Sequence, residues 1–388
     1  MKRLGVVAVA LVLAACQSAV LPTASPTAGP TVSPAPNASS TAGATATPTA
    51  TATPTAVPTS TVPPTPTVAS TEAVTPIKLL VDTDVAPDDL VALSFLVSSP
   101  AVSIQAITVS GTGEIHCPGG AAIVLRLLER LGAPQIPVAC GNTEPTTLGH
   151  AFPDLFRQNA DNAAGLDLPV TTRTPANGGA VDLITTTAAT ASGDLRILTL
   201  GPLTNVAETL ARDPDLVAQV ESIYIMGGAV DVPGNIDPTF PGAPTNNSTA
   251  EWNIYADPAA AQTVLDSGIP VFLVSLDGTN QVPITSTLVA SARAGRSSPA
   301  LGVLAELFDK NSYMTSPTYY LWDTLAAISA AGYVPNSDFT PAHLSVDVAE
   351  GPTSGRTMRG DGPLNASYMT HADPAAIEDL LVGVMGGG

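Results

Sequence analysis

Short apolar runs alternate with amphipathic stretches from residue 77 onward, and this alternation predicts strands and helices in turn. Each predicted strand is short, apolar and partly β-branched. The strands are expected at 77–81, 104–109, 136–139, 195–200, 223–226 and 271–274. Apolar residues at helical spacing predict helices at 119–131, 181–191, 203–211, 258–265, 300–308 and 324–331. This order predicts an α/β fold, a single domain built on a mainly parallel, doubly wound sheet.

The start of the chain has a different pattern. Lys2 and Arg3 precede an apolar run at 4–13, which is typical of a signal peptide, here residues 1–15. The run is too short to span a membrane comfortably as a helix. Its end, Leu-Ala-Ala-Cys at 13–16, resembles a bacterial lipobox. That resemblance implies cleavage before Cys16 and attachment of lipid to its thiol.

Residues 16–76 consist almost entirely of Thr, Ala, Pro, Ser and Val. Such low-complexity sequence cannot bury a core, so it predicts a disordered tether. The remaining segment, 77–388, is long enough for one large domain. We therefore expect an extracytoplasmic protein whose domain is anchored by lipid to the cell membrane.

The charge of the chain narrows the class of partner. There are 33 acidic and 14 basic residues, and the formal net charge is −19. This balance argues against binding to nucleic acid or to an anionic membrane surface. Cys117 and Cys140 could form a disulfide outside the cytoplasm. Two separate thiols, or a thiol near a pocket, are equally compatible with the sequence.

Four carboxylates follow the first predicted strand, at Asp82, Asp84, Asp88 and Asp89. Pro87 suits the first turn of a helix, where the helix dipole also favours acidic side chains. The acids therefore lie where a strand ends and a helix begins, at the edge of an α/β sheet that binds ligands. A hard divalent cation, Ca²⁺ or Mg²⁺, would relieve their repulsion. The alternative is an acidic helix cap with a solvated loop.

Other strand ends carry polar residues too. The stretch 200–205, Leu-Gly-Pro-Leu-Thr-Asn, is either a simple turn with a helix cap or a place where a backbone carbonyl meets a cation. Glu251 and Asn253 are two residues apart, so in an extended segment they face the same way and suit sugar hydroxyls. Asp323 follows Tyr319, Tyr320 and Trp322 at a helix start, where an acid alone is more often an N-cap than a ligand.

Taken together, these stretches resemble the inosine-uridine preferring nucleoside hydrolase family. The matching motifs, in family order, are the Asp-x-Asp-x-x-x-Asp-Asp signature at 82–89, Gly-Pro-Leu-Thr-Asn at 201–205, Met-Gly-Gly at 226–228, Ala-Glu-Trp-Asn at 250–253 and the late aromatic-Asp pair at 322–323. The resemblance covers essentially all of 77–388. It implies Ca²⁺-dependent hydrolysis of the N-glycosidic bond of ribonucleosides, which releases base and ribose. A homo-oligomer is a further expectation.

The resemblance also implies roles for individual residues. The Ca²⁺ ligands would be the side chains of Asp84, Asp89 and Asp323 and the backbone carbonyl of Leu200. Asp84 would also be the general base that takes a proton from the attacking water. The ribose hydroxyls would be bound by Asp88, Glu251, Asn253 and Asn235. This inventory agrees with the chemistry, because nearby carboxylates favour the oxocarbenium-like charge of the transition state.

The chain departs from the family pattern at two places that bear on the leaving base. Trp322 stands where many members have a His that helps to protonate the base. Activation of the leaving base must therefore come from stacking on Trp322 or from an acid elsewhere. The segment 110–117, Ser-Gly-Thr-Gly-Glu-Ile-His-Cys, replaces a common Gly-Asn pair. Its Glu114, His116 or Cys117 are candidates for acid or ribose contacts, and the alternative for His116 is a loop residue without a catalytic role.

Two other functions fit parts of the sequence. One is a non-catalytic, lipid-anchored protein that binds nucleosides or ribose in the same pocket, because a fold does not guarantee its usual activity. The other is a Mg²⁺ phosphatase of the haloacid dehalogenase class, which also places Asp-x-Asp after an apolar strand. That class needs a later catalytic Lys, for which Lys310 is the candidate.

Overall fold

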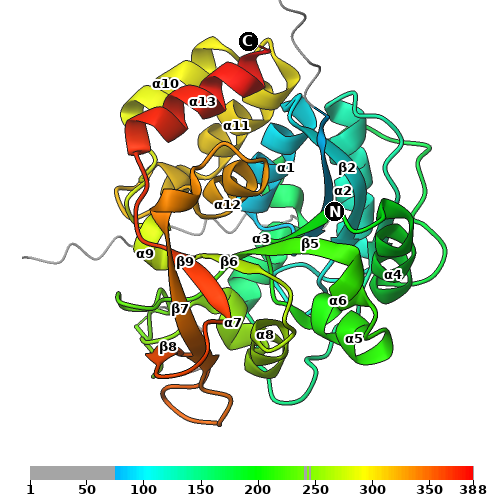
Figure 1. The fold of residues 1–388 in the computed structure, drawn as a ribbon. Coiled ribbons are helices and arrows are strands. Elements are labelled where there is room, and N and C mark those ends of the chain that lie inside the picture. The colour runs from blue at the N-terminus through cyan, green and yellow to red at the C-terminus, as the bar shows by residue number, and fades with distance from the viewer. Residues whose placement is uncertain (1–74, 240–242, 244–245, 388) are drawn as a thin grey trace, which may run out of the picture. The chain divides into compact units, whose positions relative to one another are not determined.

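The computed structural model describes residues 75–239, 243 and 246–387, and in them the strands form one mixed sheet (Figure 1). The order is β3-β2-β1-β4-β5-β6-β9-β7-β8. All neighbours from β3 to β9 pair in parallel, whereas β7 is antiparallel to both β9 and β8. The strands are β1 Ile77–Thr83, β2 Val102–Val109, β3 Val138–Cys140, β4 Leu195–Thr199, β5 Val220–Met226, β6 Val271–Val274, β7 Phe339–Val346, β8 Thr357–Gly360 and β9 Ala366–Met369.

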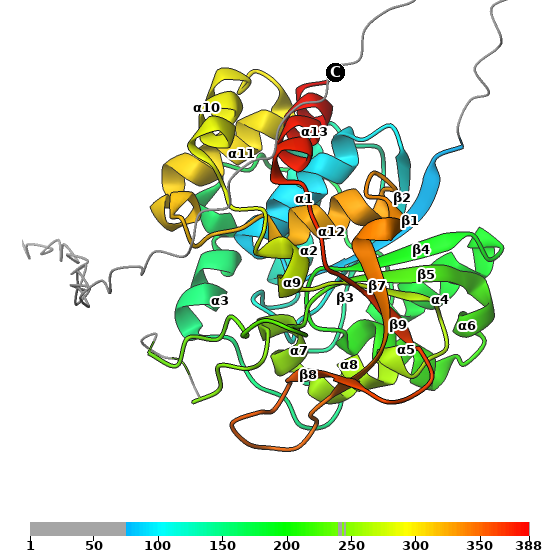
Figure 2. The same cartoon turned by 60° about the vertical axis from the view of Figure 1, so that its left-hand side comes forward.

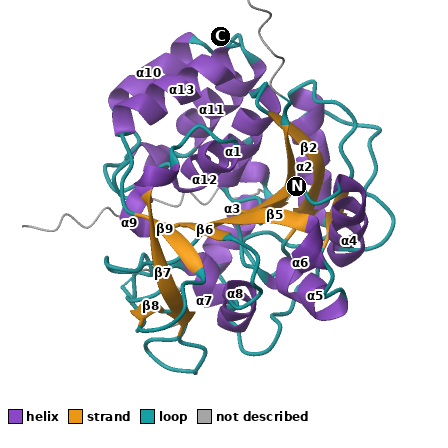
Figure 3. Cartoon of the chain, viewed as in Figure 1, coloured by secondary structure: helices purple, strands orange, loops and turns teal. Residues whose placement is uncertain are grey.

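Helices cover both faces of this sheet, as Figures 2 and 3 show. The helices are α1 Pro87–Ser98, α2 Gly119–Arg130, α3 Asp154–Asp161, α4 Ala180–Ala191, α5 Thr204–Arg212, α6 Leu216–Gln219, α7 Trp252–Ala256, α8 Pro258–Leu265, α9 Leu276–Thr279, α10 Ser286–Ala294, α11 Pro299–Lys310, α12 Trp322–Ala330 and α13 Pro374–Gly386. One apolar cluster joins the sheet to α1, α2, α11, α12 and α13, and a second joins it to α4, α5 and α8. The predicted doubly wound α/β sheet is therefore confirmed.

Strand β1 shows why the sequence reads as a continuous apolar run. Leu79 and Val81 pack into the cluster beneath α1, and Leu80 packs into the cluster beneath α4 and α5. Successive side chains of a strand point to opposite faces. A parallel strand covered on both faces is therefore apolar at nearly every position.

The strand order reverses at β1. The chain moves from β1 to β2 and β3 on one side, and then returns to add β4, β5 and β6 on the other side. Ligands of open α/β sheets bind where the order reverses, beyond the carboxyl ends of the strands. The turn after β1 and the loops after β2, β4 and β5 all reach this edge.

The predictions for the start of the chain have no structural test. The signal peptide, Cys16 and the tether up to residue 74 lie outside the described residues. Among the residues that the structure does describe, none of the helices is both long and apolar enough to cross a membrane.

Candidate active site

The turn between β1 and α1 is shaped by Asp89. Its carboxylate accepts the backbone N–H groups of Asp84 (3.2 Å) and Ala86 (3.1 Å), and it also accepts the hydroxyl of Thr83. Val85 adopts a positive φ of 60° in this turn, a conformation that costs a β-branched residue free energy. The turn thus folds back on Asp89 and directs its acids toward the carboxyl end of β1.

Three carboxylates from distant parts of the chain meet beside this turn. Ligand oxygens of Asp88, Asp89 and Asp323 lie within 4.8 Å of one another, and Asp323 comes from the first turn of α12. Asp89 and Asp323 are buried. Burial, with the charges of Asp89 and Asp88, holds the pKa of Asp323 well above its ordinary value. Burial and the Asp89 charge raise the pKa of Asp88 to about 7.

Asp84 adjoins this group through Asp89. Burial raises the pKa of Asp84 well above its ordinary value, and the charges of Asp89 and Glu114 raise it further. Its Oδ2 accepts the backbone N–H of Glu114 at 2.9 Å. Two glycines press on it: a Cβ on Gly113 would lie 2.2 Å from Asp84 Oδ2, and one on Gly201 would lie 2.7 Å from Asp84 Cβ. Asp84 is therefore held between the loops that follow β2 and β4.

This donor set suits a hard cation. Carboxylate oxygens are the preferred ligands of Ca²⁺ and Mg²⁺, and crowded, buried carboxylates with raised pKa values gain most from a positive charge among them. The Leu200 backbone N–H donates to the Asp82 carbonyl at 2.8 Å, which extends the pairing of β4 with β1. The Leu200 carbonyl accepts one hydrogen bond, from Asn253 Nδ2 at 2.7 Å. Since a carbonyl oxygen has two lone pairs, Leu200 retains capacity for a ligand.

Glu251 is the N-cap of α7, which starts at Trp252, so residues 251–253 do not form the expected extended segment. Its carboxylate caps the helix by accepting the N–H groups of Asn253 (2.9 Å) and Ile254 (3.2 Å), and it also accepts the Gly228 N–H (3.0 Å). The Glu251 charge contributes to the raised pKa of Asp88. The two carboxylates are therefore close enough to interact electrostatically.

The structure brings the other two predicted ribose contacts close to Glu251. Asn253 Nδ2 donates to the carbonyls of Leu200 and Met226 (3.2 Å), and thus joins the ends of β4 and β5. Asn235 Oδ1 accepts the Trp252 N–H at 3.1 Å, and the Asn235 N–H donates to the Ala250 carbonyl. The long loop before α7 therefore returns to the start of that helix at Asn235.

Asp82 supports the site from the other face of the sheet. It is fully buried, and its Oδ1 accepts the hydroxyl of Thr108 (2.6 Å) and the amide of Asn205 (2.7 Å). Burial raises the pKa of Asp82 to about 6 in spite of these hydrogen bonds. Thr204 donates to Asp257 at 2.9 Å. The Thr-Asn pair at the start of α5 thus connects α5 to β1 and to the start of α8, a role that the sequence motif alone did not reveal.

An aromatic wall borders the carboxylates. The Trp322 ring lies 4.7 Å from the ring of Tyr319 and 5.7 Å from that of Tyr320, and Tyr319 lies 5.7 Å from Tyr313. The Tyr319 hydroxyl donates to Asp88 Oδ1 over a long 3.5 Å. Sequence reasoning missed Tyr313, because only the folding of the turn Ser312–Thr315 onto the site places it there.

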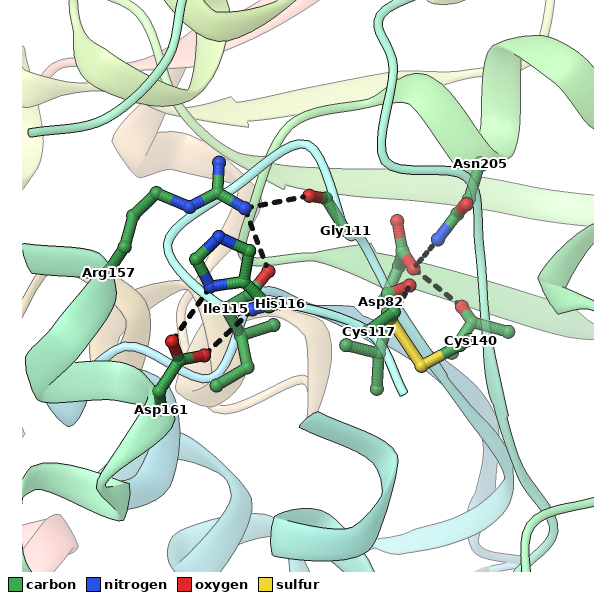
Figure 4. Close-up of a disulfide and its surroundings, with 11 residues drawn as sticks. Asp82, Gly111, Ile115, His116, Cys117, Cys140, Arg157, Asp161 and Asn205 are labelled. Atoms are coloured by element: carbon green, nitrogen blue, oxygen red, sulfur yellow. Dashed lines mark hydrogen bonds and ion pairs between the residues drawn. A yellow bond between two sulfur atoms is a disulfide. The ribbon is translucent and has the colours of Figure 1, made fainter. Parts of the chain in front are cut away.

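The segment after β2 is held by contacts that the sequence left open. Cys117 and Cys140 form a disulfide (Figure 4). His116 pairs with Asp161 of α3, Nδ1 to Oδ2 at 2.8 Å, and its side chain is 57% exposed. Burial and the charges of Asp88 and Asp89 raise the pKa of Glu114, whereas the nearby Arg157 charge lowers it. Glu114 therefore belongs to the carboxylate group, and Cys117 is no free thiol.

Two further basic residues, His150 and Lys310, have surroundings that the structure describes. His150 stacks on Tyr255, with ring centroids 3.9 Å apart, and its Nε2 lies 3.0 Å from Ser354 Oγ. Burial lowers the pKa of His150, so this ring favours its neutral form. Lys310 is exposed at the end of α11, where its side chain lies against Gly165.

Comparisons with known proteins agree on one family. The model of the inosine-uridine preferring nucleoside hydrolase family matches residues 79–379. Pyrimidine-specific ribonucleoside hydrolase RihA of Salmonella agona (strain SL483) is 36% identical over 234 residues, which cover 60% of this chain and 70% of that protein. Probable uridine nucleosidase 1 of Oryza sativa subsp. japonica is 35% identical over 208 residues, 54% of this chain and 61% of that protein.

Solved structures give the same fold over more of the chain. A purine-preferring ribonucleoside hydrolase from Gardnerella vaginalis is 26% identical with a TM-score of 0.68, covering 80% of this chain and 98% of its own. A plant nucleoside hydrolase is 25% identical with a TM-score of 0.70, covering 80% of this chain and 99% of its own.

Proposed function

The chain belongs to the inosine-uridine preferring nucleoside hydrolase family and is thus an enzyme that hydrolyses N-glycosyl bonds of nucleosides. From this premise we propose that it hydrolyses ribonucleosides to base and ribose in a Ca²⁺-dependent reaction at the carboxylate group beyond β1. The observation that carries the proposal is the meeting of Asp88, Asp89 and Asp323 within 4.8 Å, next to Asp84.

Four groups of the chain would hold the cation: Asp84, Asp89, Asp323 and the Leu200 carbonyl. Bound there, Ca²⁺ would lower the pKa of a water and fix its position. Asp84 would accept the proton of that water at Oδ1 or Oδ2. Its orientation depends on the Glu114 N–H, which already holds Oδ2. The surrounding carboxylates would stabilise the positive charge that develops on the ribose in the transition state.

The ribose would be held by Asp88, Glu251, Asn253 and Asn235. Both N–H bonds of the Asn253 amide point to the carbonyls of Leu200 and Met226, so Asn253 would accept a ribose hydroxyl through Oδ1. Glu251 carries three backbone hydrogen bonds that fix its carboxylate in place. Groups that are fixed before substrate binds lose little entropy on binding.

The base would leave along the aromatic wall. Trp322 takes the position of the usual His, and its Nε1 is buried without a hydrogen-bond partner among the described residues. Flat rings favour stacking with aromatic side chains, so we assign Trp322 to base binding. The relatives named above include both pyrimidine-specific and purine-preferring enzymes. Contacts of the base with Trp322, Tyr319 and Tyr313 would therefore decide which base is preferred, and comparison of substrates measures that preference.

The location remains as proposed from the sequence, an enzyme outside the cytoplasm that is lipid-anchored through Cys16. The two alternative functions gain no support from the site. The phosphatase reading needs a catalytic Lys, and Lys310 is exposed at the end of α11. The non-catalytic alternative keeps the same pocket without turnover, and the presence of Asp84, buried beside Asp89, adds nothing in its favour.

The test is ribose release by the folded body, residues 75–388, from inosine, adenosine, guanosine, uridine and cytidine in Ca²⁺. We expect release that Asp84→Asn lowers by roughly 10²- to 10⁴-fold, the usual contribution of a general base. Ca²⁺ binding measured by calorimetry shows whether the variant still holds the ion. Nucleoside binding without ribose release would contradict the proposed reaction and favour a binding protein.

A further inference from the structure

The loop 111–117 lies directly on Asp84. The Glu114 N–H donates to Asp84 Oδ2, and the Gly113 backbone comes so close that a Cβ there would overlap the same oxygen. The loop supplies this contact through its backbone, so the position of the loop decides where the Asp84 carboxylate points. The contacts that hold the loop in place should therefore affect the reaction too.

Helix α3 holds the loop from outside the sheet, as Figure 4 shows. Arg157 Nη2 donates to the carbonyls of Gly111 (3.3 Å) and Ile115 (3.5 Å), which flank Glu114 on both sides. The Asp161 carboxylate accepts the backbone N–H of His116 at 3.1 Å in addition to its ring contact. Arg157 and Asp161, one turn apart in α3, therefore hold the loop at three positions: Gly111, Ile115 and His116.

The far end of the loop is fixed covalently. The disulfide joins Cys117 to Cys140, the last residue of β3. Ile115 is fully buried and anchors the middle of the loop in the core. Arg157 adds one contact before Glu114, at the Gly111 carbonyl, and one after it, at the Ile115 carbonyl.

Helix α3 is itself held in place by residues that border the candidate site. Only Ala160 of α3 is buried. Asn159 Nδ2 donates to the Tyr313 hydroxyl at 2.8 Å, and the Phe156 ring lies 6.0 Å from that of Trp252, beside Glu251. The helix thus connects the aromatic wall, the ribose side and the loop on Asp84.

We propose that α3 positions the general base: Arg157 and Asp161 clamp the loop 111–117 so that the Glu114 N–H keeps the Asp84 carboxylate aimed at the attacking water. This inference rests on the proposed function, because Asp84 is a base only in that reaction. Arg157 and Asp161 are positioning residues, since they act through the loop and do not touch the ribose or the base.

Arg157→Ala is the variant that tests this clamp, and Arg126→Ala is its matched control. Arg126 is equally half-buried and also donates to two carbonyls, those of Leu168 and Pro169, in a segment that does not contact Asp84. We expect Arg157→Ala to lower kcat by roughly 10- to 100-fold, as for other residues that orient a catalytic group, with little change in KM. Arg157→Lys should restore part of kcat, because an ammonium still donates to these carbonyls.

Hydrogen–deuterium exchange of the loop gives a readout that needs no turnover. The Glu114 amide should exchange faster in Arg157→Ala and in Asp161→Ala than in wild type. Its exchange rate should be unchanged in Arg126→Ala. Thermal unfolding reports whether each variant is folded. Equal kcat in the two Arg→Ala variants, or unchanged exchange at Glu114, would overturn the inference. If wild-type protein released no ribose, the proposed function would fail, and exchange would still decide whether α3 holds the loop.

Discussion

At the scale of single residues, the site depends on backbone groups that reach carboxylates where side chains would not fit. Asp84 receives the Glu114 N–H, Asp89 receives the N–H groups of Asp84 and Ala86, and Glu251 receives that of Gly228. Each N–H bond favours one orientation of its carboxylate. The acids can therefore keep their geometry despite mutual repulsion.

Gly113 offers the sharpest test of this arrangement. A Cβ on Gly113 would lie 2.2 Å from Asp84 Oδ2, a distance that real side chains do not tolerate, so Gly113→Ala must displace either the loop or the carboxylate. We expect kcat for ribose release to fall by about 10²-fold, since a displacement near 1 Å of a catalytic group has that effect. Gly119→Ala is the control, because a Cβ there meets nothing within 4 Å.

Equal activity of the two glycine variants would show that Asp84 does not need its present orientation. That conclusion holds if a crystal structure of Gly113→Ala shows the Asp84 carboxylate displaced. Far-ultraviolet circular dichroism should be close to wild type for both variants, because neither glycine has a positive φ. The overlap with Asp84 should lower the unfolding midpoint of Gly113→Ala alone.

At the scale of elements, Asp257 joins three segments at the start of α8. Its carboxylate accepts the Ala260 N–H of α8 (3.1 Å), the Thr204 hydroxyl of α5 (2.9 Å), and both the N–H and the hydroxyl of Thr146 (2.8 Å each). Asp257 is fully buried. Its removal would leave several donors without a partner in the interior, where each costs about 1–3 kcal/mol.

Asp257→Ala should therefore lower the free energy of unfolding by about 3–5 kcal/mol, beyond the usual loss of an N-cap and within the range for breaking a buried network. Asp373→Ala is the matched control: Asp373 caps α13 by accepting the N–H groups of Ala375 and Ala376, and it is exposed. That variant should lose only about 1 kcal/mol. Urea unfolding of both variants measures the two values, and equal losses would contradict a joining role for Asp257.

The elements also show what the sequence could and could not predict. The strands β1, β2, β4, β5 and β6 are buried on both faces, so their apolar runs stand out. The antiparallel edge was missed because β7 carries Pro341 and His343 and β8 carries exposed Arg359. Helix α3 was missed because it buries one residue and so has no apolar stripe. Elements held mainly by polar contacts leave little hydrophobic pattern in the sequence from which they could be predicted.

The candidate residues divide in the same way. The group Asp82–Asp89 was readable because its members are neighbours in the chain, and Asp323 was joined to it only through the resemblance to the family. The clamp by Arg157 and Asp161, and the place of Tyr313, had no local signal. Their roles follow from the fold of α3 and of the turn Ser312–Thr315 over the pocket.

At the scale of the whole molecule, the carboxylate group joins regions that are far apart in the chain. Asp88 and Asp89 follow the first strand, Leu200 follows β4, and Asp323 lies in the first turn of α12, which packs on α1 within the same core. In the absence of a cation these carboxylates repel one another in a buried place, which opposes the packing of α12 against the β1–α1 turn. A cation that binds the folded chain alone must stabilise all of these regions together.

Removal of the cation should therefore lower both activity and stability. At a free Ca²⁺ concentration of 100 times the dissociation constant, the linkage contributes about 2.7 kcal/mol to the free energy of unfolding. We expect EDTA to abolish ribose release and to lower the unfolding midpoint, and Ca²⁺ to restore both. Asp323→Asn removes one charged ligand, so its midpoint should respond to Ca²⁺ only at much higher concentration. Because this variant also relieves repulsion, it should be at least as stable as wild type in EDTA. An unfolding midpoint that ignored Ca²⁺ in wild type, with full ribose release in EDTA, would exclude a bound cation from both the fold and the reaction.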